Sequence, residues 1–97
     1  MQVDLTPKIP VAEIMGPFRE AAPVYAKVEG LVWKLWLVNQ EKGTAGGIYY
    51  FKDQESLDKH IASDLYKQML AHPALEKVDV KIFDIIEEFS KVTRAPI

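Results

Sequence analysis

The sequence predicts a single α+β domain, residues 1–97, in which one four-stranded antiparallel sheet carries both of its helices on one face. Three observations predict this class. Four short stretches have the apolar pattern of strands, and two longer stretches repeat apolar residues at helical spacing. They follow one another as strand, helix, strand, strand, helix, strand. This is the order of the split βαβ, ferredoxin-like arrangement, with the first and third strands central and the second and fourth at the edges.

The N-terminal part predicts a short strand followed by an interrupted helix. Residues 1–5, MQVDL, alternate apolar and polar side chains. Pro10 suits a first helical turn, and the helix is expected to restart at Gly16-Pro17, because Pro17 and Pro23 each lack a backbone donor. After the restart, one apolar stripe follows the helical period: Phe18, Ala21, Ala22, Tyr25 and Val28.

A hairpin is predicted in the middle of the chain. Residues 31–38, LVWKLWLV, form the second strand, which is apolar on both faces. The glycine-rich loop 39–47 leads into the third strand, GIYYFKD, at 47–53. A slip of one residue in the hairpin would put Tyr50 beside Trp36. The preferred register pairs Val38 with Gly47, Trp36 with Tyr49, and Lys34 with Phe51.

The C-terminal half predicts a helix and the fourth strand. Asp53 is expected to cap the helix, which ends at His72-Pro73. Residues 77–86, KVDVKIFDII, alternate as a strand, and the tail 87–97 is expected to extend this strand or to form an arm. The buried stripe of the helix recurs every four residues, at Leu57, Ile61, Leu65 and Met69.

Composition excludes several function classes. With 12 Lys and Arg against 14 Asp and Glu and no basic cluster, the chain is not expected to bind nucleic acid. The absence of cysteine excludes disulfides and thiolate chemistry. No apolar run reaches a membrane span and no signal-peptide pattern begins the chain, so a cytoplasmic location without membrane attachment is expected. No metal site is expected, because no carboxylates at ligand spacing accompany His60 and His72.

The two-faced apolar strands predict a homodimer. Helices on one face of the sheet would leave the other face of the second and third strands open to water. The second strand also lies at a predicted edge, where an apolar strand favours pairing with a neighbour. Two copies packed sheet against sheet would cover these surfaces. The alternative is a monomer in which Trp33 or Trp36 is half exposed.

One face of the predicted hairpin gathers aromatic side chains around a single cation. Such a slot suits a flat phenolic ligand whose phenolate an ammonium group would stabilise. The alternative is that the aromatic residues belong to the core or the dimer interface and that the lysine extends to solvent. The predicted slot comprises Lys34, Trp36, Tyr49 and Phe51. Further candidates for the pocket are Trp33, Tyr50 and His60.

Two ionisable residues are candidates for general acid–base catalysis beside the slot. Asp4 lies on a predicted central strand, where a desolvated carboxylate would act as a base with a raised pKa; the alternative is a charge at a frayed strand end. His60 precedes Ile61 of the helical stripe, so it either borders that stripe or lies on the surface.

Three segments resemble a known family. GLVWKLW at 30–36, AGGIYYF at 45–51 followed by Asp53, and KIFDI at 81–85 are similar to corresponding segments of the YdhR-like mono-oxygenase family. The resemblance covers most of the chain and is strongest from Gly30 onward. It implies a dimeric α+β barrel of two ferredoxin-like subunits and kinship with antibiotic-biosynthesis mono-oxygenases, which oxidise polyphenolic or quinol substrates with dioxygen and no cofactor. Haem binding also occurs in the wider superfamily, and a single histidine could serve as the ligand of the haem iron.

The expected function is a cofactor-independent mono-oxygenase acting on an aromatic or quinol-like small molecule. Its catalytic candidates are Lys34, Tyr49 and Asp4. One alternative is a non-enzymatic homodimer that binds a small apolar molecule or serves a structural role. Another is a ferredoxin-like isomerase, which needs no oxygen but does need a base such as Asp4 or His60 in the cavity.

Overall fold

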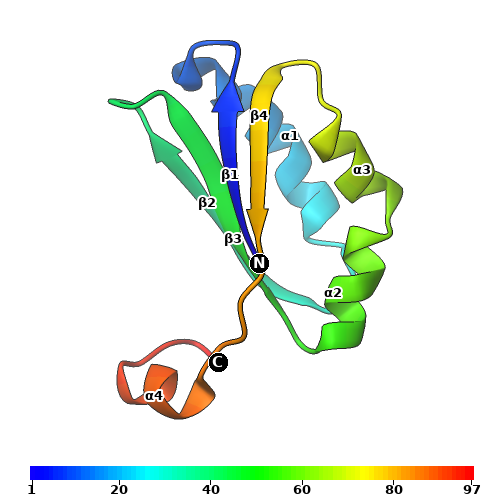
Figure 1. The fold of residues 1–97 in the computed structure, drawn as a ribbon, viewed down its shortest axis with the longest axis vertical. Coiled ribbons are helices and arrows are strands. Elements are labelled where there is room, and N and C mark those ends of the chain that lie inside the picture. Colours follow the sequence, from blue (N-terminus) through cyan, green and yellow to red (C-terminus); the bar gives the residue numbers. More distant parts are fainter.

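The computed structural model describes all 97 residues as a sheet layer and a helical layer (Figure 1). The strand order, β2-β3-β1-β4, is antiparallel throughout and confirms the predicted ferredoxin-like topology, with β1 and β3 central. In chain order the elements are β1 (Gln2–Pro7), a 3-10 turn (Val11–Ile14), α1 (Met15–Tyr25), β2 (Leu31–Asn39), β3 (Thr44–Phe51), α2 (Gln54–Ile61), α3 (Asp64–Leu70), β4 (Leu75–Lys81) and α4 (Glu87–Val92).

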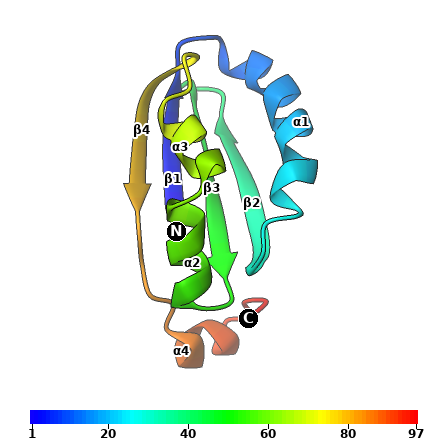
Figure 2. The same ribbon diagram turned by 90° about the vertical axis from the view of Figure 1, so that its right-hand side faces the viewer.

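Three of the helices cover one face of the sheet. Seen from the helical side, α1 lies toward β2, while α2 and α3 lie in front of β1 and β3 (Figure 2). The main core fills the space between the two layers, because the apolar side chains of each strand alternate toward the helices. Its buried members are Met1, Val3, Leu5, Tyr25, Tyr49, Phe51, Leu57 and Tyr66. None of the helices has the length and apolar character that crossing a membrane requires.

The proline-rich helix begins as a 3-10 turn and continues as α1. Pro17 lies in the first turn of α1, where backbone donors have no partner within the helix. Pro23 lies in the last turn, where it removes one backbone donor while the helix continues to Tyr25. Phe18, Ala21 and Tyr25 of the predicted stripe lie on α1 and pack toward the core, whereas Ala22 is exposed and Val28 lies beyond the end of the helix.

The predicted single helix after Asp53 is wrong, since two helices occupy this segment. Asp53 caps α2 as expected, accepting from the backbone nitrogen of Ser56 at 2.8 Å. Ser63 then caps α3, where its hydroxyl accepts from the backbone nitrogen of Tyr66 at 3.2 Å. A serine with extended backbone can begin a helix, and this second cap divides the segment in two.

The predicted hairpin register is wrong by two residues. Trp36 pairs with Gly47 and Lys34 pairs with Tyr49, so β3 begins at Thr44 and the loop is shorter than expected. The loop closes with Asn39 accepting from the backbone nitrogen of Lys42 at 3.0 Å, followed by Gly43 at a φ of 66°. The one-residue slip is wrong as well, because Tyr50 pairs with Trp33. A shift of two residues keeps the side chains from Trp33 to Val38 on their predicted faces, because the pleat repeats every two residues. An irregularity between Leu31 and Trp33 breaks the alternation at the start of β2, so that Leu31 packs against the core while Val32 is 52% exposed.

The helix-free surface of the sheet, here called the open face, is divided into an apolar and a polar half. On β1 and β4, Lys81 lies 3.4 Å from a carboxylate oxygen of Asp4 and 3.6 Å from one of Asp79. The apolar half lies on β2 and β3 and comprises Trp33, Leu35, Leu37, Ile48 and Tyr50.

The C-terminal tail forms an arm. The fourth strand ends at Lys81, so its predicted continuation to residue 86 is wrong. The chain leaves the sheet and carries the short α4 below the body of the domain (Figure 1). It returns far enough for the indole nitrogen of Trp33 to donate to the carbonyl oxygen of Pro96 at 3.2 Å. The arm exposes large apolar side chains, namely Ile82, Phe83, Ile85, Ile86, Phe89 and Val92.

Candidate functional site

A cavity of about 230 Å³ lies between the sheet and the helices. Strands β1, β2 and β3 form its floor, and α1 and α3 form its walls. Its lining contains no carboxylate, and most of the side chains are apolar. An apolar cavity of about 150 Å³ is sufficient for benzene, so this one has room for a substituted aromatic ring.

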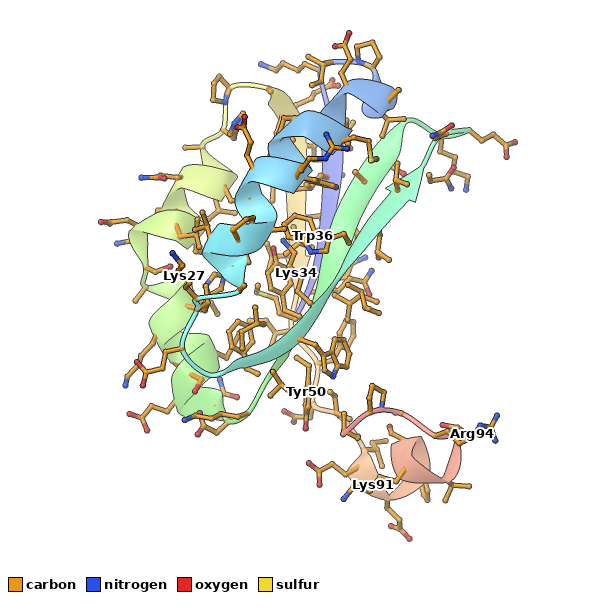
Figure 3. The ribbon with its side chains drawn as sticks, turned by 180° about the vertical axis from the view of Figure 1, so that it is seen from behind. Lys27, Lys34, Trp36, Tyr50, Lys91 and Arg94 are labelled. Carbon is orange, nitrogen blue, oxygen red and sulfur yellow. The ribbon has the colours of Figure 1, made fainter.

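Lys34 is the single lysine in the lining, and aromatic rings surround its amine. The Nζ atom lies 3.5 Å from the ring centroid of Trp36, 3.8 Å from that of Tyr25 and 4.4 Å from that of Tyr49. Figure 3 shows Lys34 and Trp36 lying between β2 and α1. We call Tyr25, Trp36 and Tyr49 the aromatic cage.

Gly47 provides the space that the lysine occupies. A Cβ atom at this position would lie 2.9 Å from Cε of Lys34 and 3.0 Å from the carbonyl oxygen of Leu35. Gly47 is the cross-strand partner of Trp36 and has no side chain, so neighbouring side chains can occupy the space over its Cα atom. Trp36 is held from the helical side by Phe18, with ring centroids 4.9 Å apart.

The amine of Lys34 has no carboxylate partner and donates no hydrogen bond within the chain. Burial lowers its pKa from 10.5 to about 7, because the charged form loses hydration. The rings of the cage attract the ammonium form and so act against this loss. Near neutral pH, a large fraction of the molecules therefore carries a neutral, nucleophilic amine at the cavity.

The two phenols of the cage are neutral hydrogen-bond donors. Burial raises the pKa of Tyr25 and, more strongly, that of Tyr49, because phenolate anions are poorly solvated there. The hydroxyl of Tyr49 lies 3.9 Å from the sulfur of Met69, a weak acceptor that a ligand oxygen would easily replace.

His60 lies behind the cage and is only 4% exposed, so the surface alternative for this residue is wrong. Its ring packs against Tyr25, Tyr49, Phe51 and Tyr66. Burial, followed by the charge of Lys34, lowers its pKa, and Nε2 has no hydrogen-bond partner. His60 does not line the cavity, so it does not fit the role of a haem ligand there. No group of three or more His, Asp or Glu side chains lies together to hold a metal ion.

The structure brings together Lys34, Trp36 and Tyr49, three of the predicted slot residues. Phe51 stacks on Tyr49 with centroids 6.3 Å apart, but it lies in the core outside the cavity lining. Trp33 and Tyr50 lie on the open face, with centroids 5.4 Å apart, and so belong to a different surface.

Asp4 does not lie beside the slot, so its predicted placement is wrong. Its neighbours Val3 and Leu5 face the core, and its own side chain therefore faces the open side of the sheet. There it accepts from Gln2 and pairs with Lys81, both of which hold the carboxylate outside the cavity.

Tyr25 is the functional candidate that the sequence interpretation missed. It was assigned only to the apolar stripe of the helix, yet that stripe already directs it toward the hairpin. Gln68 and His72 were also missed; they come from α3 and the residues after it and add polar groups to the lining.

Comparisons with known proteins agree with this architecture. The chain is similar to the NE2512 protein of unknown function from Nitrosomonas europaea, with a TM-score of 0.64 and 19% identity over 87% of each chain. It is also similar to a conserved protein from Methanosarcina mazei Go1, with a TM-score of 0.58 and 23% identity over 86% of this chain and 91% of the other. These likenesses concern the fold. No curated protein matches the chain.

A family model described as "Putative mono-oxygenase ydhR" matches residues 1–96. The match spans every strand and helix, including the hairpin that carries Lys34, Trp36 and Tyr49. The chain therefore belongs to the ydhR family of putative mono-oxygenases.

Proposed function

We propose that the protein is a mono-oxygenase that oxidises a flat phenolic or quinol-like molecule with dioxygen, without a cofactor. The observation that carries the proposal is the unpaired amine of Lys34, a residue that lines an apolar cavity and whose amine is enclosed by an aromatic cage. The size of the cavity suits one substituted ring system. Family membership supports the reaction class.

Lys34 supplies the acid–base step. In its neutral form the amine accepts the proton of the bound phenol, and the resulting ammonium then pairs with the phenolate. A phenolate ring is richer in electrons than the phenol and reacts more readily with dioxygen. One oxygen atom enters the product and the other leaves as water, with the electrons for both supplied by the quinol-like substrate.

The aromatic cage positions the ring. Trp36 lines the cavity, and the hydroxyl groups of Tyr25 and Tyr49 remain protonated because their pKa values are raised. They are donors for the substrate oxygen as negative charge develops on it.

Oxygen consumption tests this function. With a panel of phenols and hydroquinones, wild type is expected to consume dioxygen, and Lys34→Met is expected to lose about 100-fold in rate, the usual size of a general-base contribution. The matched control is Lys27→Met, an exposed lysine after α1, which should keep the wild-type rate. The absence of uptake across the panel, or equal rates for wild type and Lys34→Met, would contradict the proposal.

A binding protein without catalysis is the second candidate. The lining offers one amine but no carboxylate as an acid–base partner, which favours simple binding. In that case a phenol would raise the melting temperature of the protein and be recovered unchanged. Neither Asp4 nor His60, the two bases considered for the isomerase alternative, lines the cavity.

We further propose that two copies of the chain form a homodimer through their open faces. The apolar half of that face exposes Leu35 by 50% and Leu37 by 38%, on an edge strand. An exposed apolar edge is commonly covered by a neighbour. The exposed apolar side chains of the arm extend the surface available to a second copy.

The mass in solution tests the dimer. At micromolar concentration, light scattering is expected to give twice 11.0 kDa, or about 22 kDa, for wild type. Leu35→Asp should shift the mass toward 11.0 kDa, because a carboxylate would be buried at the interface. Val24→Asp, at an exposed apolar position on α1, is the control and should remain dimeric. A wild-type mass near 11.0 kDa would exclude this dimer.

A further inference from the structure

We propose that Lys34 is a covalent carbonyl-binding site: its amine condenses with an apolar aldehyde or ketone in the cavity to form a Schiff base. The proposal concerns the same cavity as the proposed oxygenase, but it needs no dioxygen. It rests on the placement of Lys34, which lines the cavity and whose amine lies 3.5 to 4.4 Å from three ring centroids.

The surroundings of the amine favour condensation over simple ion pairing. The three lysine–carboxylate pairs of the chain involve Lys59 and Lys81, so Lys34 is free of such a partner. The groups that face it are the phenols of Tyr25 on α1 and Tyr49 on β3, with His60 of α2 behind them. None of these groups carries a negative charge at neutral pH, so none holds the amine as an ammonium ion. A lysine desolvated among apolar groups is a common means of activating this nucleophile.

The condensation is balanced without a redox partner. The amine nitrogen attacks the carbonyl carbon, a carbon–nitrogen bond forms, and the carbonyl oxygen leaves as water after proton transfers. The phenol of Tyr25 or Tyr49 is a suitable donor for that oxygen, since both phenols border the amine. The apolar walls limit the water available to reverse the reaction.

The size and polarity of the cavity define the ligand class. At about 230 Å³ the cavity accommodates an aryl or comparably sized apolar carbonyl compound. No second cation lies beside the amine to bind a phosphate group. Aldehydes that carry a phosphate are therefore disfavoured.

Reductive trapping tests the proposal. Intact protein is incubated at pH 7 with limiting benzaldehyde and sodium cyanoborohydride, which adds hydride to the imine carbon, and peptides are mapped by mass spectrometry. We expect one benzyl group on Lys34, in at least about ten-fold excess over any surface lysine, because a lysine of ordinary pKa is almost wholly protonated at this pH. The excess should shrink as the pH approaches 10, where surface lysines also become neutral.

Two variants and one internal competitor complete the test. Lys34→Met should lose the cavity adduct while keeping its fold, and Lys27→Met should label as wild type does. The α-amino group of Met1 is the competitor: burial lowers its pKa, but it donates to the carbonyl oxygen of Tyr49 at 3.0 Å. Labelling that is confined to Met1, or spread over surface lysines equally in wild type and Lys34→Met, would overturn the proposal. Because the trap needs no oxygen, its result is independent of oxygen uptake, and either proposal can fail while the other stands.

Discussion

Lys34→Met is expected to stabilise the protein at neutral and mildly acidic pH, even though it removes the proposed catalytic amine. Each unit of pKa shift corresponds to about 1.4 kcal/mol of differential interaction. The pKa of Lys34 falls from 10.5 to about 7 on folding, and the side chain remains partly exposed. After a reduction for solvent screening, we expect the free energy of unfolding to rise by about 2 kcal/mol in the variant.

The pH dependence has a definite sign. Between pH 7 and pH 10.5 the unfolded chain binds a proton at Lys34 that the folded chain has lost, so wild-type stability rises with pH across this window. Below pH 7 both states bind the proton and the penalty is complete. The advantage of Lys34→Met should therefore be largest at pH 6 and should decline toward zero near pH 10.

Urea unfolding of both proteins at pH 6, 8 and 10 measures this difference. The matched control is Lys27→Met, whose lysine is exposed, and its stability should differ from wild type by a pH-independent amount. If Lys34→Met were less stable than wild type at pH 6, the amine would have a partner that holds its charge. A residue that lowers stability while facing a cavity is typical of a functional site, where activity is gained at the expense of stability.

Gly46→Ala is expected to destabilise the domain by about 3 kcal/mol, because it would overpack the centre of the sheet. A Cβ atom at Gly46 would collide with the carbonyl oxygen of Val3 and lie 3.2 Å from its carbonyl carbon. These atoms belong to the backbone of β1, one of the two central strands, and Val3 is only 1% exposed. A flexible side chain could move aside, but here the two central strands must separate.

Thermal and urea unfolding measure the loss, and Gly16→Ala is the matched control. Gly16 lies near the start of α1 with nothing within 4 Å of its Cβ position. Alanine favours a helix over glycine, so this variant should equal or exceed wild-type stability by up to about 1 kcal/mol. Equal stabilities for Gly46→Ala and wild type would show that β1 and β3 can separate without cost.

Local patterns of the sequence predict the fold well. Alternation in β1, β3 and β4, the stripes of α1 and α2, and the cap at Asp53 each depend on residues close together in the chain. The boundary between α2 and α3 also has a local signal, the helix cap at Ser63. It was not predicted because the apolar stripe has the same four-residue spacing on both sides of Ser63.

The candidate site could be predicted only in part. Lys34, Trp36 and Tyr49 share a face in the predicted register and in the observed one, because the two differ by an even number of residues. Tyr25 enters the cage from α1, a different element, so strand periodicity alone could not place it. Of the two alternatives for His60, the border of the apolar stripe and the surface, packing against four aromatic rings contradicts the second.

By itself the sequence determined the order of the four strands and of the helical segments between them, the shared face of Lys34, Trp36 and Tyr49, and the single cation of the aromatic hairpin, because these follow from periods of two and 3.6 residues. The tertiary structure alone decided the hairpin partners, the ion pair that holds Asp4 on the open face, and the enclosure of Lys34 by Tyr25. These features depend on contacts between residues far apart in the chain, and local sequence patterns do not predict such contacts. The desolvation that makes the amine of Lys34 reactive is therefore a property of the packed layers.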